Sequence, residues 1–144
     1  MTEDATAQKL AKQCADFMYS SDKASQALGI QIEEIGPGSA RLSMKVREDM
    51  ANGQGNCHGG IIFALADSAF AFACNSYNRV TVAQGGNIDF VRPARAGDLL
   101  TAMAEEKSRG RSTGVVDVEV TRDDGKTVAL FRGKSFSIDQ ALLP

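Results

Sequence analysis

Apolar residues recur at helical spacing near the start of the chain and alternate with polar residues soon afterwards. Within residues 5–19 they follow the spacing of one helix face, at Ala7, Leu10, Ala11, Cys14, Phe17 and Met18. This spacing predicts an amphipathic helix over about residues 5–20. In residues 39–46, by contrast, every second residue is apolar. Such alternation predicts a half-buried strand, which pairs through a Gly-Pro-Gly turn with residues 30–35.

The segment 61–76, IIFALADSAFAFACNS, follows neither pattern. It is too long for a typical strand, rich in alanine and without alternation, which predicts a helix that is apolar nearly all round and therefore buried. The rest of the chain has the pattern of four strands, at about residues 80–92, 97–108, 112–122 and 127–138. Turns rich in glycine, arginine and aspartate separate them.

The predicted order is therefore one helix, two strands, a long buried helix and four strands. Strands joined by short turns pair antiparallel, and a helix that is apolar on all sides has to be wrapped by a sheet. A curved antiparallel sheet around a long central helix is the hot-dog fold, of the α+β class. Such a layer leaves sheet edges uncovered, so we expect a homodimer or a larger assembly.

Composition narrows the class of protein. The 144 residues, 43% hydrophobic and 24% charged, suit one globular domain over residues 1–144. A net charge of -2 without a basic block argues against a nucleic-acid partner. Three cysteines without metal-type spacing predict no metal site and fit a cytoplasmic location. The N-terminus lacks a signal-peptide core, and no apolar run reaches the ~20 residues of a membrane span.

Asp67 is the one charged residue between Gly60 and Cys74. Burying an ionised aspartate without a partner costs roughly several kcal/mol, so this position must be compensated or used. Gly59 and Gly60 come just before the apolar segment. Without side chains, their backbone N–H groups can approach a ligand at the positive end of a helix. Such donors suit a carbonyl oxygen that gains negative charge, as in an oxyanion hole.

The spacing of Asp67 and Gly59 carries a further prediction. Eight residues along one helix separate them by about 12 Å, whereas reacting groups must approach to roughly 3 Å. Two such helices lying antiparallel across a two-fold axis would bring Asp67 of one subunit to Gly59 of the other. We therefore expect a homodimer with shared active sites, in which Asp67 is the base or the nucleophile of acyl transfer to water.

Less active roles are open for each of these residues. Asp67 could be a structural carboxylate in the dimer interface, and the two glycines could form a helix entry without a ligand. His58 is the only histidine and no GxSxG motif is present, so we interpret it as fixing the loop rather than as a base. By default Asn52 is a turn residue and Cys57 an inert thiol.

The segment NGQGNCHGGIIFALADSAFAFACNS resembles the hot-dog acyl-CoA thioesterases of the PaaI (phenylacetic acid degradation) type. The likeness continues through NIDFVRPARAGD, STGVVDVEV and KTVALFRGKS and covers most of residues 25–137. It implies hydrolysis of aromatic acyl-CoA substrates, such as phenylacetyl- or hydroxyphenylacetyl-CoA, by a homotetramer built from hot-dog dimers. No cofactor is implied, because coenzyme A is part of the substrate.

The resemblance also implies roles for single residues. The family's helix aspartate falls on Asp67, as base or nucleophile, and the glycine whose N–H polarises the thioester carbonyl falls on Gly59. The loop asparagine that helps to position the water or the thioester falls on Asn52. His58 and Gly60, on either side of Gly59, are then candidate substrate-binding residues.

Two further candidates lie outside this segment. Some relatives place a serine or threonine on the strand after the helix, where this chain has Ala83, Gln84 and Gly85, so Gln84 is a possible substitute. The phosphates of coenzyme A are expected at basic surface residues, first of all near SRGRST, which contains Arg111 and Ser112.

Two other functions stay open. A hot-dog hydroxyacyl-thioester dehydratase pairs a histidine with an acid, here His58 with Asp67, although the His-Phe-Pro loop of such enzymes is absent. A non-catalytic acyl-CoA-binding module would use the same glycines to hold a ligand that is never cleaved.

Overall fold

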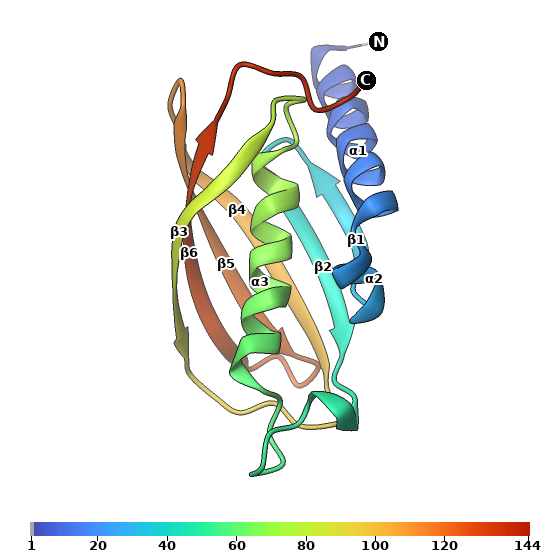
Figure 1. Ribbon diagram of the computed structural model, residues 1–144, viewed down its shortest axis with the longest axis vertical. Coiled ribbons are helices and arrows are strands. Elements are labelled where there is room, and N and C mark those ends of the chain that lie inside the picture. The colour runs from blue at the N-terminus through green and yellow to red at the C-terminus, as the bar shows by residue number, and fades with distance from the viewer. Residues whose placement is uncertain (1) are drawn as a thin grey trace.

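A computed structural model describes residues 2–144 and shows one antiparallel sheet wrapped around a central helix (Figure 1). Two helices, α1 (Glu3–Ser21) and α2 (Lys23–Ala27), precede strands β1 (Gln31–Gly36) and β2 (Ser39–Lys45). A 3-10 turn, η1 (Glu48–Met50), leads into the central helix α3 (Gly59–Cys74). The remaining strands are β3 (Thr81–Phe90), β4 (Leu99–Arg109), β5 (Thr113–Arg122) and β6 (Thr127–Ser137).

All neighbouring strands pair antiparallel, in the order β1-β2-β4-β5-β6-β3. β3 follows α3 in sequence but pairs with β6, so the chain crosses the sheet between β2 and β3. The predicted hot-dog fold of the α+β class is confirmed. No helix within residues 2–144 is both long and apolar enough to span a bilayer.

The core lies between α3 and the face of the sheet that curves around it. Alternate residues of the strands point inward, as the sequence pattern predicts, and Leu42, Met44, Val118 and Val120 are almost fully buried. From α3, Leu65, Ala66, Ala69 and Phe70 face them. The Phe70 ring lies so close to β6 that a Cβ at Gly133 would come within 2.8 Å of it, so only glycine fits there.

The start of α3 differs from the prediction. The helix begins at Gly59 rather than at residue 61, so Gly59 and Gly60 form its first turn instead of preceding it. His58 is the N-cap residue, and its ring nitrogen Nδ1 accepts the N–H of Gly60 at 3.2 Å. This cap offsets the poor helix propensity of two successive glycines.

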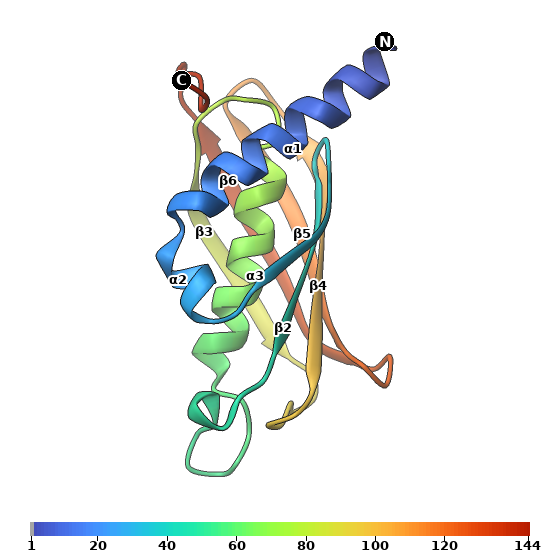
Figure 2. The ribbon, with the colours of Figure 1, turned by 90° about the vertical axis from the view of Figure 1, so that its right-hand side faces the viewer.

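The N-terminal region also contains more than the single predicted helix. α1 runs from Glu3 to Ser21, and the short helix α2 follows at once. Asp22 starts α2, because its carboxylate accepts the N–H of Ser25 at 3.0 Å and the Ser25 hydroxyl at 2.6 Å. Both helices lie on the β1–β2 side of α3 (Figure 2), where the Ser25 and Ser68 hydroxyl oxygens are 3.3 Å apart.

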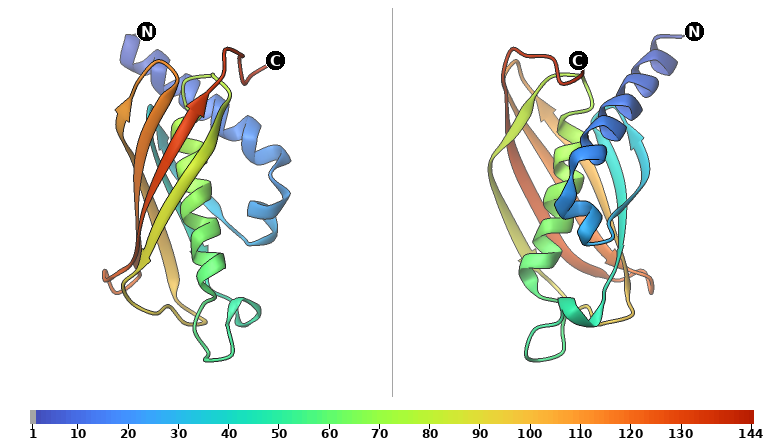
Figure 3. Two further views of the ribbon diagram at one scale, coloured as in Figure 1. Left: turned by 60° about the vertical axis from the view of Figure 1, so that its left-hand side comes forward. Right: turned by 45° about the vertical axis from the view of Figure 1, so that its right-hand side comes forward.

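The opposite side of α3 is only partly covered by this chain. Asp67 lies on that side, one turn after Phe63, whose ring packs edge-on against Phe131 of β6. Along the same face Gly60 is exposed, while Ala64 and Ala71 are half-buried. Next to this face runs β3, an edge of the sheet (Figure 3), most of whose side chains are exposed.

Candidate active site

The first turn of α3 has one backbone donor that no group within residues 2–144 accepts. The N–H groups of Ile61 and Ile62 donate to the carbonyl of His58, at 2.9 and 3.2 Å, and that of Gly60 donates to the His58 ring. The Gly59 N–H remains, at the positive end of the helix. It is therefore the donor available to a ligand oxygen.

His58 and Gly60 have a structural role in this turn. Because Nδ1 of His58 accepts a hydrogen bond, the neutral ring carries its proton on Nε2. The Gly60 N–H is committed to this contact. Of the three residues His58, Gly59 and Gly60, the structure thus leaves the N–H of Gly59 for polarising a carbonyl.

Asn52 shapes the loop before α3. Its side-chain oxygen accepts the N–H groups of Gln54 at 2.9 Å and of Asn56 at 3.2 Å, and its own N–H donates to the Asn56 carbonyl at 2.7 Å. The side-chain oxygen of Asn52 therefore has the structural role in a turn that the sequence predicts by default. Its side-chain amide nitrogen donates to no group within residues 2–144. This donor is therefore available to a ligand.

A cavity of about 340 Å³ brings Asn52 and Gly59 together. Ile62, Phe90 and Pro93 supply part of its apolar wall. The Phe90 ring packs directly on the glycine, because a Cβ at Gly59 would lie 3.1 Å from Phe90 Cζ. The cavity thus combines a few polar groups with an aromatic wall, as small-molecule sites commonly do.

Asp67 is half-buried and makes neither a hydrogen bond nor an ion pair within residues 2–144. Burial raises the pKa of its carboxyl above the ordinary value of 3.8. A carboxylate with a raised pKa is a stronger base. Since α3 separates Asp67 from Gly59 of the same chain by about 12 Å, the two cannot act on one carbonyl within a single subunit.

Arg111 and Ser112 lie at the opposite end of the sheet from Gly59. Phe90, beside Gly59, pairs with Ala129 of β6, whereas the Ser112 carbonyl accepts the N–H of Ser137. Eight strand residues span about 26 Å, so one chain does not bring these two residues to its own Gly59. They line a shallow depression together with Arg79 and Phe136.

Gln84 is likewise remote from Gly59 within one chain. It is exposed and lies at a bulge of β3, where the pairing with β6 shifts between Ala83 and Gly85. Six residues, or about 20 Å of strand, separate it from Phe90. Its place on the sheet edge means that its neighbours in an assembly would come from another subunit.

The buried thiols are poor nucleophiles. Burial raises the pKa of Cys57, and it raises the pKa of Cys74 to about 12. At neutral pH both are protonated, and the thiolate is the reactive form. Within residues 2–144 no three histidine, cysteine, aspartate or glutamate side chains gather in a group that could hold a metal ion.

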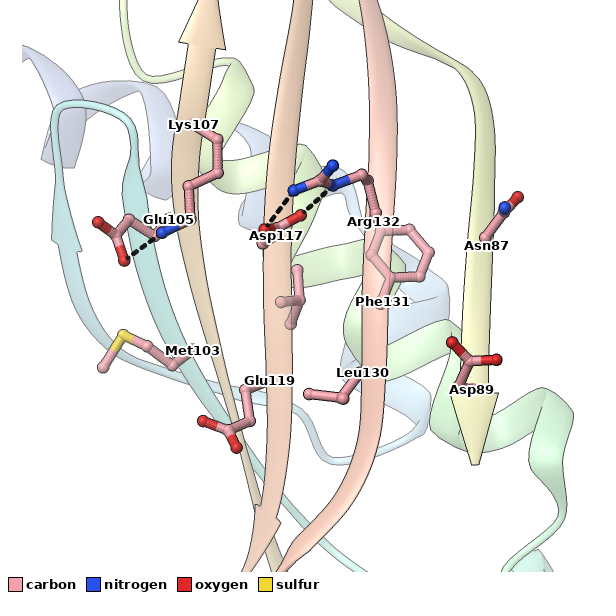
Figure 4. A pocket seen from close by; sticks show the side chains of 11 residues that line it. Asn87, Asp89, Met103, Glu105, Lys107, Asp117, Glu119, Leu130, Phe131 and Arg132 are labelled. Atoms are coloured by element: carbon pink, nitrogen blue, oxygen red, sulfur yellow. Dashed lines mark hydrogen bonds and ion pairs between the residues drawn. The ribbon is translucent and has the colours of Figure 1, made fainter. Parts of the chain in front are cut away.

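A larger groove of about 570 Å³ lies on the outer face of the sheet (Figure 4) and contains none of the predicted site residues. Arg132 binds Asp117 through two contacts of 2.6 and 2.8 Å, and Lys107 lies 3.3 Å from Glu105. Glu119 accepts the hydroxyl of Thr127 at 2.7 Å. These charges are satisfied by one another and by strand neighbours.

Comparisons with known proteins identify the family to which this fold belongs. Residues 54–129 match the family model described as the thioesterase superfamily. Over 126 residues, 88% of this chain and 90% of the relative, the sequence is 50% identical to acyl-coenzyme A thioesterase PaaI of Escherichia coli K12.

Two solved structures extend the comparison. The E. coli PaaI protein from the phenylacetic acid degradation operon superposes with a TM-score of 0.92 at 48% identity, over 93% of this chain and 97% of that one. A hypothetical thioesterase from Streptococcus pneumoniae TIGR4, solved with coenzyme A, superposes with a TM-score of 0.79 at 28% identity, over 88% and 97%. The likeness thus includes the loop, α3 and the sheet.

Proposed function

The chain belongs to the thioesterase superfamily and is a thioester hydrolase, and we propose that it hydrolyses aromatic acyl-CoA thioesters to the free acid and coenzyme A. Phenylacetyl- and hydroxyphenylacetyl-CoA are the proposed substrates, because the similar E. coli protein is named an acyl-CoA thioesterase and comes from a phenylacetic acid degradation operon. The observation that carries the proposal is on α3, where the Gly59 N–H and the Asp67 carboxylate have no hydrogen-bond or ion-pair partner within residues 2–144.

The proposed reaction uses both groups. The thioester carbonyl oxygen accepts the Gly59 N–H, and the carboxylate of the partner's Asp67 takes a proton from water as the water oxygen bonds to the carbonyl carbon. The oxyanion then re-forms the carbonyl, the carbon–sulfur bond breaks, and the proton passes from Asp67 to the leaving thiolate. Alternatively, the Asp67 carboxylate attacks the carbonyl carbon, the carbon–sulfur bond breaks and the coenzyme A thiolate leaves. Water then hydrolyses the resulting anhydride, which releases the free acid, regenerates Asp67 and supplies the proton of the thiol. In this proposal the side-chain amide nitrogen of Asn52, which lines the same cavity as Gly59, holds the water or the thioester.

The two groups meet only between subunits, so the proposal includes a homodimer with antiparallel α3 helices. The small residues near Asp67 on this helix face allow a second helix to approach closely: they are Gly60, Ala64 and Ala71. The exposed β3 edge offers unpaired backbone groups along the same side of the chain. An antiparallel arrangement would also carry Arg111 and Ser112 of one subunit toward the Gly59 end of the other. Pairing of such dimers into a homotetramer, in the cytoplasm, completes the proposal.

A dehydratase is less well supported by the same site. It would need His58 as a base beside Asp67, but Nδ1 of the neutral His58 ring accepts the Gly60 N–H at 3.2 Å and Nε2 carries the proton, so neither ring nitrogen is free to take a proton from a substrate. The capping contact therefore favours hydrolysis over dehydration.

The function is tested by thiol release, followed with a disulfide dye, from phenylacetyl-, hydroxyphenylacetyl-, benzoyl- and straight-chain acyl-CoAs. We expect the fastest release from the arylacetyl substrates. Binding of acyl-CoA without thiol release would identify a binding module instead. Loss of water from a 3-hydroxyacyl-CoA, without thiol release, would identify a dehydratase.

A further inference from the structure

Phe90 is the last residue of β3, and its side chain is on the inner face of the sheet. Its strand partner Ala129 is buried, and Ile88, two residues earlier on the same face of β3, is half-buried. The sheet extends here to the start of α3, so the Phe90 ring meets the first turn of the helix rather than the core. Its Cζ, Cε2 and Cε1 atoms lie 3.1, 3.4 and 3.5 Å from the position of a Cβ at Gly59.

The other side of the ring is open. Phe90 is 52% exposed although it faces inward, and it lines the cavity that contains Asn52 and the Gly59 N–H. Core packing therefore uses only part of this ring. The exposed part forms an aromatic wall beside the Gly59 N–H, the backbone donor of this turn that has no acceptor within residues 2–144.

A ligand that fills such a cavity needs a carbonyl oxygen for the Gly59 N–H and an apolar group within reach of the Phe90 ring. An arylacetyl thioester has both, separated by one methylene group. Aromatic pairs gain energy beyond the area they bury when they stack offset or edge-to-face, with centroids about 4.5–7 Å apart. An alkyl chain of similar size would bury area against Phe90 but would not form such a pair.

We propose that Phe90 is a specificity-determining residue, whose ring packs against the aromatic ring of the acyl group and so places the adjacent carbonyl at the Gly59 N–H. This inference rests on the proposed function. It gives the glycine a second purpose, because a side chain at position 59 would displace the ring that selects the substrate.

The test is the ratio of kcat/KM for phenylacetyl-CoA to kcat/KM for hexanoyl-CoA. In Phe90→Leu we expect this ratio to fall about 3- to 10-fold, mainly through a higher KM for the aryl substrate. Phe90→Tyr, which keeps an aromatic ring, should retain it. Both substrates are assayed on one preparation, so a partly unfolded sample does not alter the ratio. If Phe90→Leu yields no folded protein, Phe90→Met provides the same comparison with a non-aromatic side chain of greater length.

Phe17→Leu is the matched control, because Phe17 is 43% exposed on α1, outside the cavity. Its ratio should equal that of the wild type. An unchanged or higher ratio in Phe90→Leu would overturn the inference while the thioesterase activity of the wild type still stood. Absence of thiol release from every acyl-CoA in the wild type would remove the proposed function and this inference with it.

Discussion

The start and middle of α3, with the cavity at Gly59, and the groove on the outer face of the sheet differ in how most of their charged and polar groups are paired. In the outer groove, Arg132 pairs with Asp117 and Lys107 with Glu105. At the helix, Asp67 has no partner within residues 2–144, and the Gly59 N–H has no acceptor there. The outer groove is the larger of the two, at about 570 against about 340 Å³.

The region proposed as reactive is therefore not the one with the larger cavity volume. An ion pair at a surface stabilises a fold by only about 0–1 kcal/mol, and its charges are already occupied. A half-buried carboxylate without a partner destabilises the fold and remains available for chemistry. The comparison can be tested by removing groups from each region in turn.

The largest effect is expected from Asp67→Asn. Loss of a general base should lower kcat by about 10²- to 10⁴-fold, measured as thiol release at saturating substrate. The melting temperature at neutral pH should stay the same or rise. Burial raises the pKa of Asp67 in the folded state above its ordinary value of 3.8. The folded state therefore loses stability as pH rises from the ordinary pKa through the raised pKa, because Asp67 ionises less readily there than in the unfolded chain. Asparagine never ionises, so any rise in melting temperature over the wild type should be present at pH values above the raised pKa and absent at pH values below the ordinary one.

A lower melting temperature at neutral pH would contradict this prediction. It would mean that the ionised Asp67 has a partner in the assembly and acts as a structural carboxylate. Retention of most of the turnover would exclude Asp67 as base and nucleophile.

A smaller loss is expected from Gly59→Pro, which removes the N–H that has no acceptor within residues 2–144. Proline suits the first position of a helix, and the preceding residue, His58, already has the extended conformation that proline requires, at φ -58° and ψ 133°. Gly59→Ala is the control, because it brings a Cβ against the Phe90 ring and keeps the N–H. We expect kcat of the proline variant to be about 10²- to 10³-fold below that of the alanine variant. Equal activities would exclude the N–H as oxyanion donor.

Gly59→Pro also tests whether each active site is shared between two subunits. Mixed and refolded with Asp67→Asn, it should give heterodimers in which one of the two sites has both groups intact. Random pairing would then restore about a quarter of the wild-type activity. No recovery beyond the sum of the two variants would mean that each subunit works alone.

Much of the fold could be predicted from the sequence, because β2, β4, β5 and β6 bury alternate residues over most of their length, as in Leu42 and Met44. The start of α3 could not, because glycine has no side chain to mark a helix face and the cap depends on the His58 ring folding back to Gly60. α2 was missed for a similar reason, since five residues are too few to show a period.

In the candidate site, Asp67 and Gly59 could be predicted from the sequence, because a single charged residue in an apolar helix and a glycine at the start of that helix are evident in the sequence itself. Phe90 was missed. A half-exposed phenylalanine at the end of a strand has the same pattern in sequence as a buried one. Its contact with Gly59 joins positions 31 residues apart and arises only from the crossing of β3 over the helix start.

The smallest effect is expected from Asp117→Asn in the outer groove, and its sign should be opposite to that of Asp67→Asn. The hydrogen bonds from Arg132 lower the pKa of Asp117, so its ionised form stabilises the fold above the unfolded-state pKa and this contribution is lost as pH falls. Since the pair is exposed, a double-mutant cycle with Arg132→Gln should give a coupling of about 0.2–1 kcal/mol, measured by denaturant unfolding. Thiol release should be unchanged. A drop in thiol release comparable to that of Asp67→Asn would mean that the outer groove takes part in the reaction. In that case the pairing of charged groups would not distinguish a reactive region from an unreactive one.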